Sequence, residues 1–360
     1  MSTLQAVNLK NAASASNNIV LDASGNATFA GTAAMASSFL RNRIINGGME
    51  IAQRGTTATG TYNSVYVYAS VDRWAVFSAN SSTTQAQSTD APAGFRNSFR
   101  VQRPAGNTGT NALVSIQGIE SVNCYDLSGQ QVTLSFWSKR GANYSGGNLA
   151  VTFVTGTTAD QGIAFVDSWA GRATPIATTT PITTTWTRYT FTGTVGSGVL
   201  EAGVQLLWFP SGTAGADDSV YITGVQLEVG TVATPFERRQ YEQELALCQR
   251  YFQSVQMPLT GYFGQYASGA GGFVGVLVPH IVTMRSAPTG TFTSSSTGGN
   301  FWTILATQAL STNSTANVSI ETYNDGWRMR QTPVTLVATP TNGGLYVWEQ
   351  AFVVTLSAEL

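Results

Sequence analysis

The sequence predicts a mainly β protein built around a jelly-roll sandwich, and three observations lead to this prediction. Charged residues make up 10% of the chain, against roughly 25% in ordinary globular proteins, and hydroxyl and amide side chains fill the polar positions instead. Between Phe39 and Phe236, short apolar or alternating segments are separated by Gly, Ser and Asn, without helical periodicity. The length of 360 residues leaves room for two or three domains.

Residues 1–38 predict an N-terminal arm with one short hairpin. Ile19 to Leu21 and Ala27 to Phe29 flank the turn sequence DASGN. Two strands of this length bury no core of their own. The arm is therefore either an unstructured tail or a segment ordered by a partner or by sister chains.

Residues 39–236 predict the sandwich, because strand-like segments recur throughout with turn residues between them. The expected strands are Val71–Phe77, Phe99–Val101, Ala112–Ile119, Gln131–Trp137, Leu149–Val154, Trp186–Phe191, Val204–Phe209 and Val220–Val229. In the last of these, alternation places Tyr221, Val225, Leu227 and Val229 on one face. The tract Thr178–Thr185 contains Pro181, which favours an edge strand or a loop.

Residues 237–253 predict a helical junction. Thr234, Pro235 and Glu237 have the spacing of an N-cap, a first helical residue and a capping-box acid. Downstream, apolar residues recur at spacings of four, three and four, as in a coiled-coil seam of about two heptads: Tyr241, Leu245, Cys248 and Phe252. So short a helix is marginal alone, so it packs either on its own domain or on two copies of itself around a threefold axis.

Residues 254–360 predict a second, C-terminal β domain with its own apolar strands. These are Phe273–Val278, Phe301–Leu305, Val318–Tyr323 and Leu345–Leu356. No repeat of 20 to 50 residues occurs, which disfavours a solenoid.

Composition argues against several classes of function. The net charge is −1 and Lys10 and Lys139 are the only lysines, which disfavours nucleic-acid binding. No segment approaches the roughly 20 apolar residues of a membrane span, and the first twenty residues lack the apolar core of a signal peptide. Cys124 and Cys248 are expected to be buried free thiols.

Catalysis has little support in the sequence. The single histidine, His280, has no nucleophile motif nearby. Hydrolysis of a polysaccharide requires two carboxylates at a defined separation, and the sequence does not bring any pair together from Glu201, Glu228, Glu321 and Asp325. We therefore expect no enzyme activity, no cofactor and no metal.

Several stretches resemble, in order, tail-fibre and related structural proteins of tailed phages and prophages. They are RNRIINGGMEIAQRGTT, VDRWAVF, QGIESVNCYDLSGQQVTLSFWSKRG, TTTWTRYTFTGTV and VYITGVQLEVGTVATPFERRQYEQELALCQRYF. The resemblance covers residues 39–252 and is most specific from LEVG to CQRYF. The distal stretches VPHIVTMRSAPTGTFT and LSAEL, and the N-terminal NIVLDASGNATFAGT, resemble the ends of such fibre chains.

The resemblance implies a homotrimeric adhesion protein of the virion tail. Its N-terminal arm would attach to other tail or baseplate proteins, and its jelly roll would be similar to carbohydrate-binding modules. Many such modules hold calcium with carboxylates near the first and last strands. Here the corresponding acid is missing from Ile222-Thr223-Gly224, so Asp217, Asp218 and Glu50 are either calcium ligands or ordinary turn carboxylates.

Sugar binding needs an aromatic face and a few polar anchors. In the sandwich the candidates are Trp137, on the strand face opposite Val132 and Leu134, and the loop residues Tyr144, Trp169 and Arg172. In the distal domain they are the residues of the hairpin TYNDGWRMR: Tyr323, Asp325, Trp327 and Arg328. The alternative for all of these residues is that they pack within the protein and bind no ligand. Trp208 lies on a strand that is apolar on both faces and is expected in the core.

We therefore predict a homotrimeric tail fibre or receptor-binding protein that attaches to a host cell-surface glycan without covalent change. The first alternative is a purely structural tail or baseplate component with no ligand site. A polysaccharide depolymerase is the other.

Overall fold

The structure, a computed structural model, has two compact units, Met1–Arg41 and Asn42–Leu360. The division lies close to the predicted end of the arm at residue 38. The residues described are 8–9, 19–21, 27–29, 41–62, 64–79, 81–257, 265–266, 274–294, 301–305, 310–313, 318–323, 326–331, 344–348 and 352–359. No helix within these residues combines the length and the apolar character needed to cross a membrane.

The first unit contains the predicted hairpin. β2 (Ile19–Leu21) pairs antiparallel with β3 (Ala27–Phe29), with Ile19 opposite Phe29. A third strand, β1 (Asn8–Leu9), pairs with the other edge of β2. The hairpin prediction is confirmed.

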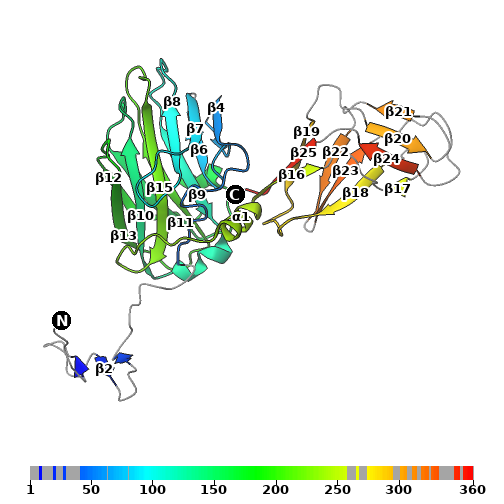
Figure 1. The fold of residues 1–360 in the computed structure, drawn as a ribbon. Coiled ribbons are helices and arrows are strands. Elements are labelled where there is room, and N and C mark those ends of the chain that lie inside the picture. Colours follow the sequence, from blue (N-terminus) through cyan, green and yellow to red (C-terminus); the bar gives the residue numbers. More distant parts are fainter. Residues whose placement is uncertain are drawn as a thin grey trace, which may run out of the picture. The chain divides into compact units, whose positions relative to one another are not determined.

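The second unit begins with a sandwich of two six-stranded antiparallel sheets, which confirms the predicted jelly roll (Figure 1). The β15 sheet contains, in spatial order, β13 (Thr187–Thr194), β10 (Gln131–Arg140), β15 (Asp218–Val229), β8 (Ser98–Arg103), β7 (Ser82–Ser88) and β4 (Thr57–Thr61). The β14 sheet contains β12 (Ala173–Thr180), β11 (Leu149–Gly156), β14 (Glu201–Trp208), β9 (Leu113–Ile119), β6 (Ala75–Ser78) and β5 (Tyr66–Val67).

The core lies between the two sheets because alternate residues of each strand point inward. Leu134 and Phe136 of β10 belong to the same buried cluster as Val204 and Leu206 of β14. Trp208 is 2% exposed and belongs to this cluster, as predicted. β14 lies between β11 and β9, which explains why both of its faces are apolar.

β15 contains a β-bulge that the alternation in the sequence does not reveal. The register against β10 shifts between Ser135 and Trp137, and Gly224, with φ +61°, lies opposite this shift. Because β15 has one extra residue at the bulge, the residues that point inward before it differ by one position from those that simple alternation predicts. Val225 and Leu227 point into the core, as predicted, but Tyr221 does not, because Ile222 takes the inward position instead. The predicted placement of Tyr221 beside Val225 is therefore wrong.

Four strands of the sandwich were not predicted: β4, β5, β7 and β12. β12 ends in the Thr-rich tract, at Thr180, and is an edge strand. This agrees with the expectation that Pro181 keeps the tract out of a central position. Three short 3₁₀ segments also occur: Ser121–Asn123, Tyr125–Leu127 and η3 (Ile163–Ser168).

The outer face of the β14 sheet is apolar and covered. Val114 and Ile116 of β9 form a second buried cluster with Ile163 and Val166 of η3 and with Trp169. The η3 segment therefore closes this face with its own side chains.

The predicted helix start at Thr234 is wrong, because the residues of the apparent capping box bind elsewhere. The Thr234 hydroxyl donates to Glu228 Oε2 over 2.8 Å. Glu237 accepts a hydrogen bond from the backbone N–H of Asn42 over 2.6 Å. The helix α1 (Tyr241–Gln249) begins later, after Gln240, so residues 230–240 cross the sandwich in an irregular conformation.

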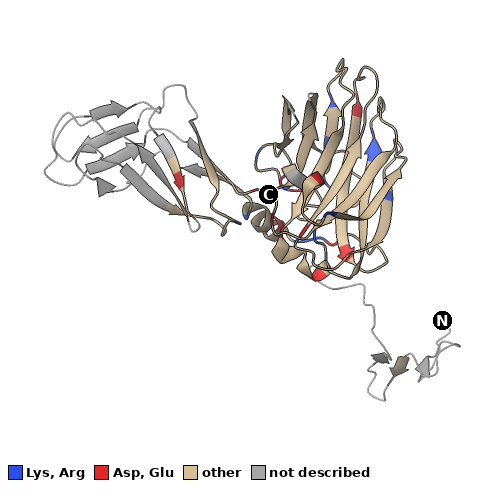
Figure 2. Cartoon of the chain, turned by 180° about the vertical axis from the view of Figure 1, so that it is seen from behind, with Lys and Arg blue, Asp and Glu red and all other residues tan. Residues whose placement is uncertain are grey.

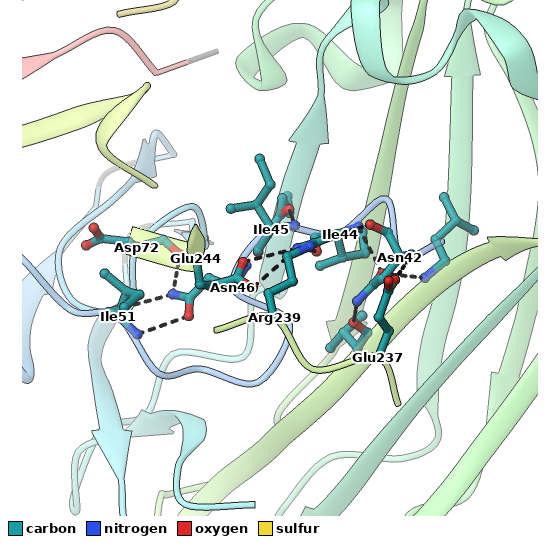
Figure 3. Close-up of polar contacts among 12 residues, drawn as sticks. Asn42, Ile44, Ile45, Asn46, Ile51, Asp72, Glu237, Arg239 and Glu244 are labelled. Carbon is teal, nitrogen blue, oxygen red and sulfur yellow. Dashed lines mark hydrogen bonds and ion pairs between the residues drawn. The ribbon is translucent and has the colours of Figure 1, made fainter. Parts of the chain in front are cut away.

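The segment after Arg41 is held by asparagine side chains (Figure 3). Asn42 Oδ1 accepts from the N–H groups of Ile44 and Leu227, and Asn46 bonds the backbone of Ile51 and Asp72. Arg239 and Glu244 bond the backbone of the same segment. The first and the last of the five stretches that carry the resemblance therefore bond to each other in the structure.

The four predicted seam residues do not form one exposed strip. Cys248 is fully buried against Ile45 and Ile51, and Phe252 is 6% exposed. Leu245 is half-buried against the same cluster, and Tyr241 is 57% exposed. The prediction is therefore wrong for Cys248 and Phe252, whose surfaces the chain's own residues already cover. Cys124 and Cys248 are both free and buried, as predicted.

The distal region contains three small antiparallel sheets. The first has β16 (Phe252–Met257), β25 (Phe352–Ser357) and β19 (Thr289–Ser294). The second has β17 (Gln265–Tyr266), β18 (Val274–Pro279), β23 (Gly326–Gln331) and β22 (Val318–Thr322). The third has β21 (Leu310–Asn313), β20 (Phe301–Leu305) and β24 (Gly344–Trp348).

Both ends of the distal region meet the same two arginines, the half-buried Arg54 and the buried Arg73. The Arg54 guanidinium lies 3.6 Å from the Phe252 ring centroid, and that of Arg73 lies 3.4 Å from the Tyr251 ring centroid. Glu359, near the end of the chain, pairs with Arg54 over 3.0 Å and also with Arg73. The two arginines therefore fasten the first and the last strand of this region to the base of the sandwich.

Candidate functional site

The outer face of the β15 sheet carries a row of aromatic and charged side chains, the Trp186 row. Lys139 of β10 lies opposite Tyr221 of β15, which in turn lies opposite Arg100 of β8. Trp186 immediately precedes β13, one residue beyond the ladder pair Ser138–Thr187, and so continues the row past Lys139. Adjacent strands thus bring together four residues that are distant in the sequence.

The side chains of the row contact one another. Lys139 Nζ lies 4.8 Å from the Tyr221 ring centroid and 5.7 Å from that of Trp186. Arg100 lies 5.7 Å from the Tyr221 centroid on the other strand. Trp186 and Tyr221 meet edge to face, with centroids 6.3 Å apart. Tyr221 is the buried floor of this arrangement, and the other three are half-buried.

A carboxylate holds each end of the row. Asp90 pairs with Lys139 and accepts a hydrogen bond from the indole of Trp186 over 3.0 Å. Asp217 lies 3.5 Å from Arg100. Burial alone would raise the pKa of Asp90, but hydrogen bonds from Lys139 and Trp186 outweigh it and lower the pKa below 3.8. Both ends are therefore ionised at neutral pH.

The same balance holds at Asp217. Burial again raises the pKa, whereas the Ser219 hydroxyl, the backbone N–H of Ala142 and then Arg100 lower it, and the net pKa lies below its usual value. The row therefore presents fixed charges and an indole ring, a combination that suits hydroxyl-rich ligands. Charged positions are otherwise sparse along the sandwich ribbon (Figure 2).

A second set of aromatic residues, the Trp137 group, lies on the same face. Its members are Trp137 of β10 and the half-buried Phe95 and Phe236. The rings of Phe95 and Phe236 have centroids 5.1 Å apart. A side chain at Gly224 would place its Cβ 2.5 Å from Phe95 Cζ and 3.0 Å from Trp137 Cδ1. The bulge glycine therefore gives these two rings the space to approach each other.

Two of the predicted glycan-binding aromatics are buried, and a third, Tyr144, is half-buried against the core. Trp169 is 3% exposed under η3 and donates its indole N–H to the carbonyl of Gly162. Tyr144 packs on Trp208 with centroids 4.9 Å apart. Trp327 is fully buried in the core of the distal region. These residues serve packing, and the predictions that placed Trp169 and Trp327 on a ligand surface are wrong.

The remaining predicted residues are dispersed. Trp137 does face outward, as predicted. Tyr323 is 39% exposed, and Arg172 is exposed and bonded to the Val166 carbonyl beside η3. The side chain of Arg328, and Asp325 altogether, lie outside the described residues.

The carboxylates considered for catalysis or metal binding are engaged or buried. Glu228 and Glu201 are each 1% exposed, and burial raises the pKa of Glu201 to about 8. Asp218 is buried in an ion pair of 2.7 Å with Arg103, and Glu50 accepts from Asn97. Glu321 accepts from the Tyr323 hydroxyl, and His280 Nε2 contacts the Tyr323 carbonyl. Across the described segments, no three His, Cys, Asp or Glu residues gather as metal ligands.

Comparison with known proteins finds similarity only at the level of solved structures. No family model matches the chain, and no curated protein matches it. One similar structure is the enzymatically active domain of tailspike protein 4 of bacteriophage CBA120, with 16% identity and a TM-score of 0.31. That match covers 52% of this chain and 21% of the tailspike chain.

Two carbohydrate-binding modules of family 22 are also similar. The C-terminal module of Clostridium thermocellum Xyn10B has 13% identity and a TM-score of 0.31, covering 50% of this chain and 97% of the module. The xylan-binding module of Paenibacillus barcinonensis Xyn10C has 9% identity and a TM-score of 0.29, covering 49% and 95%.

Sequence reasoning missed most of the Trp186 row. It placed Lys139 on the same strand face as Trp137, but it did not single out Trp186 or Arg100, and it put Tyr221 on the same face as Val225 and Leu227. The glycine in an otherwise apolar strand, Gly224, is the one signal that indicated a bulge and a change of facing.

Proposed function

We propose that this chain is a homotrimeric receptor-binding protein of a phage tail, which attaches the virion to a host cell-surface glycan by non-covalent contacts on the outer face of the β15 sheet. The observation that carries the glycan part is the Trp186 row. It combines a half-buried indole with Lys139 of β10, Arg100 of β8 and two flanking carboxylates, while the opposite outer face is closed by η3. The phage part is supported by the sequence resemblance over residues 39–252.

Binding at this face requires no covalent step. The Trp186 ring offers an apolar surface to the C–H face of a pyranose, and Asp90, Lys139 and Arg100 offer acceptors and donors for its hydroxyl groups. Lys139 and Arg100 lie in strands, and Asp90 bonds both Lys139 and the Trp186 indole, so these side chains are already ordered and lose little entropy on binding.

The test uses the soluble full-length protein as a competitor. We expect it to reduce virion adsorption to host cells in a saturable manner, and Asp90→Ala together with Lys139→Ala to weaken this competition. Wild-type protein that folds and leaves adsorption unchanged at micromolar concentration would contradict the receptor role.

One observation favours a purely structural component as the second candidate. Asp90 and Asp217 already have ionic partners in the protein, so the row is internally satisfied without a ligand. This candidate predicts no competition and no binding to any glycan.

The trimer is a separate part of the proposal. Tyr241 is 57% exposed and Leu245 is half-buried, so they remain the seam positions on α1 that a sister chain can contact. We expect Tyr241→Asp combined with Leu245→Asp to convert trimer to monomer in light-scattering mass measurements, with the sandwich still folded. A wild-type protein that is monomeric at micromolar concentration would exclude the trimer.

A further inference from the structure

Unpaired arginines gather beside one aromatic group. Within the described part of the chain, most arginine side chains have a carboxylate at ion-pair distance. Arg96, Arg140, Arg188 and Arg238 have none there. Arg188 lies opposite Trp137 in the ladder and Arg238 lies over the Phe95 ring, while Arg96 follows Phe95 in the sequence.

Arg188 and Arg238 approach this group from two different segments. Arg188 of β13 lies directly opposite Trp137 in the ladder, and its guanidinium donates to the Ser135 hydroxyl over 3.1 Å and to the Thr234 carbonyl. Arg238, in the crossing segment after the last sandwich strand, lies 4.7 Å from the Phe95 ring centroid and donates to the Gly94 carbonyl. Both guanidinium groups donate to neutral oxygens, and the ion pairs among the described residues do not include either of them.

Arg96 adds a third cation because it follows Phe95 directly and is exposed. Three carboxylates of this area accept hydrogen bonds from neutral groups, and one of them, Glu228, is buried and accepts from Thr234. Glu50 accepts from Asn97, and Glu237 accepts from the backbone N–H of Asn42. The guanidinium groups of Arg188 and Arg238 therefore lie beside the aromatic rings without a carboxylate at ion-pair distance among the described residues, a geometry in which an external anion can pair with them.

We propose that the Trp137 group, with Arg96, Arg188 and Arg238, binds an anionic sugar unit carrying a carboxylate, sulfate or phosphate. This inference rests on the proposed glycan-binding function and names the substrate class for the same sheet face. Guanidinium groups pair with such anions in a planar, two-bond geometry, and the indole accommodates the apolar face of the sugar ring. The Trp186 row, which contains its own carboxylates, then contacts hydroxyl groups of neighbouring units.

The test measures binding of the full-length protein to four polymers: polygalacturonate, dextran sulfate, a phosphate-bearing mannan and neutral dextran. We expect at least one polyanion to bind about tenfold or more tightly than dextran at low salt, with affinity falling as salt rises. The three anions separate carboxylate, sulfate and phosphate as the recognised group.

Variants distinguish a built site from general attraction. Arg238→Gln and Arg188→Gln should each weaken polyanion binding about tenfold, and Trp137→Ala should do so without changing any charge. Arg172→Gln is the matched control, because it removes an exposed arginine on the opposite side of the sandwich. Arg238 is exposed, so its variant folds even where Arg188→Gln does not.

The outcomes for the two proposals are separable. Equal binding of neutral and anionic polymers, no binding of any polyanion, or loss caused equally by Arg172→Gln would overturn the anionic class. Failure of the protein to compete with virions, alongside intact polyanion binding, would overturn the receptor function instead.

Discussion

The outer faces of the two sandwich sheets differ in exposure: other residues of the chain cover the outer face of the β14 sheet, whereas the outer face of the β15 sheet is open. On the β14 sheet the outward residues, such as Val114 and Ile116, are apolar, and η3 with Trp169 closes over them. On the β15 sheet the outward residues are Lys139, Tyr221 and their neighbours, and charged groups remain half-exposed. An aromatic residue next to a strand therefore contributes to packing where its sheet face is covered, and is accessible to a ligand where that face is open.

The largest expected effect comes from a substitution on the covered outer face of the β14 sheet. Trp169→Ala removes a buried ring and leaves a cavity, so we expect the free energy of unfolding to fall by about 3–5 kcal/mol. Denaturant titration measures this loss. Glycan affinity below the melting transition should stay unchanged, and a loss of affinity in folded protein would mean that the covered face also takes part in binding.

The second prediction concerns the open face. Trp186→Ala removes the indole of the Trp186 row and its hydrogen bond to Asp90, so we expect glycan affinity to fall about tenfold to a hundredfold, or ~1.4–2.8 kcal/mol. Titration calorimetry with the bound polymer measures the change. The free energy of unfolding of the Trp186→Ala variant should differ from that of the wild type by less than ~1 kcal/mol, because Trp186 is half-buried and precedes β13. A large stability loss would make Trp186 a core residue like Trp169.

The third and smallest effect is a pH dependence confined to the open face. The pKa of Asp90 is lowered, so its pairing with Lys139 is fully present above the usual carboxyl pKa of 3.8 and is lost as pH falls through the lower folded value. We therefore expect affinity to be level from about pH 8 to 5 and to decline only below about pH 4. In Asp90→Asn this acid decline should diminish. A transition near pH 6 would point to a different titrating group.

The comparison also shows how far local patterns extend. Thr234 and Glu237 have the spacing of a helix cap. In the structure they form hydrogen bonds with Glu228 and Asn42 instead, and both of these residues are distant from the helix start. Trp327 follows the turn-type sequence NDG, which predicts a hairpin-tip residue, yet it lies in β23 with its side chain buried in the distal core. Whether a residue follows its local propensity depends on which hydrogen-bonding and packing partners compete for it. The neighbouring sequence shows only some of these partners.

The sequence alone determined the elements whose pattern is local. The hairpin of Ile19–Leu21 and Ala27–Phe29 follows from its turn residues, and the burial of Trp208 follows from a strand that is apolar on both faces. The outward facing of Trp137 and Lys139 also follows, because no irregularity interrupts β10 in the sequence.

Only the tertiary structure decided which surface is open. The Trp186 row combines residues from β10, β15, β8 and the start of β13, and their adjacency depends on strand order, which alternation does not encode. The bulge at Gly224 inverts the facing of Tyr221, and one residue of slip exchanges the two faces of a strand. The covering of one face by η3 and the exposure of the other result from where distant segments pack, which is a property of the whole chain.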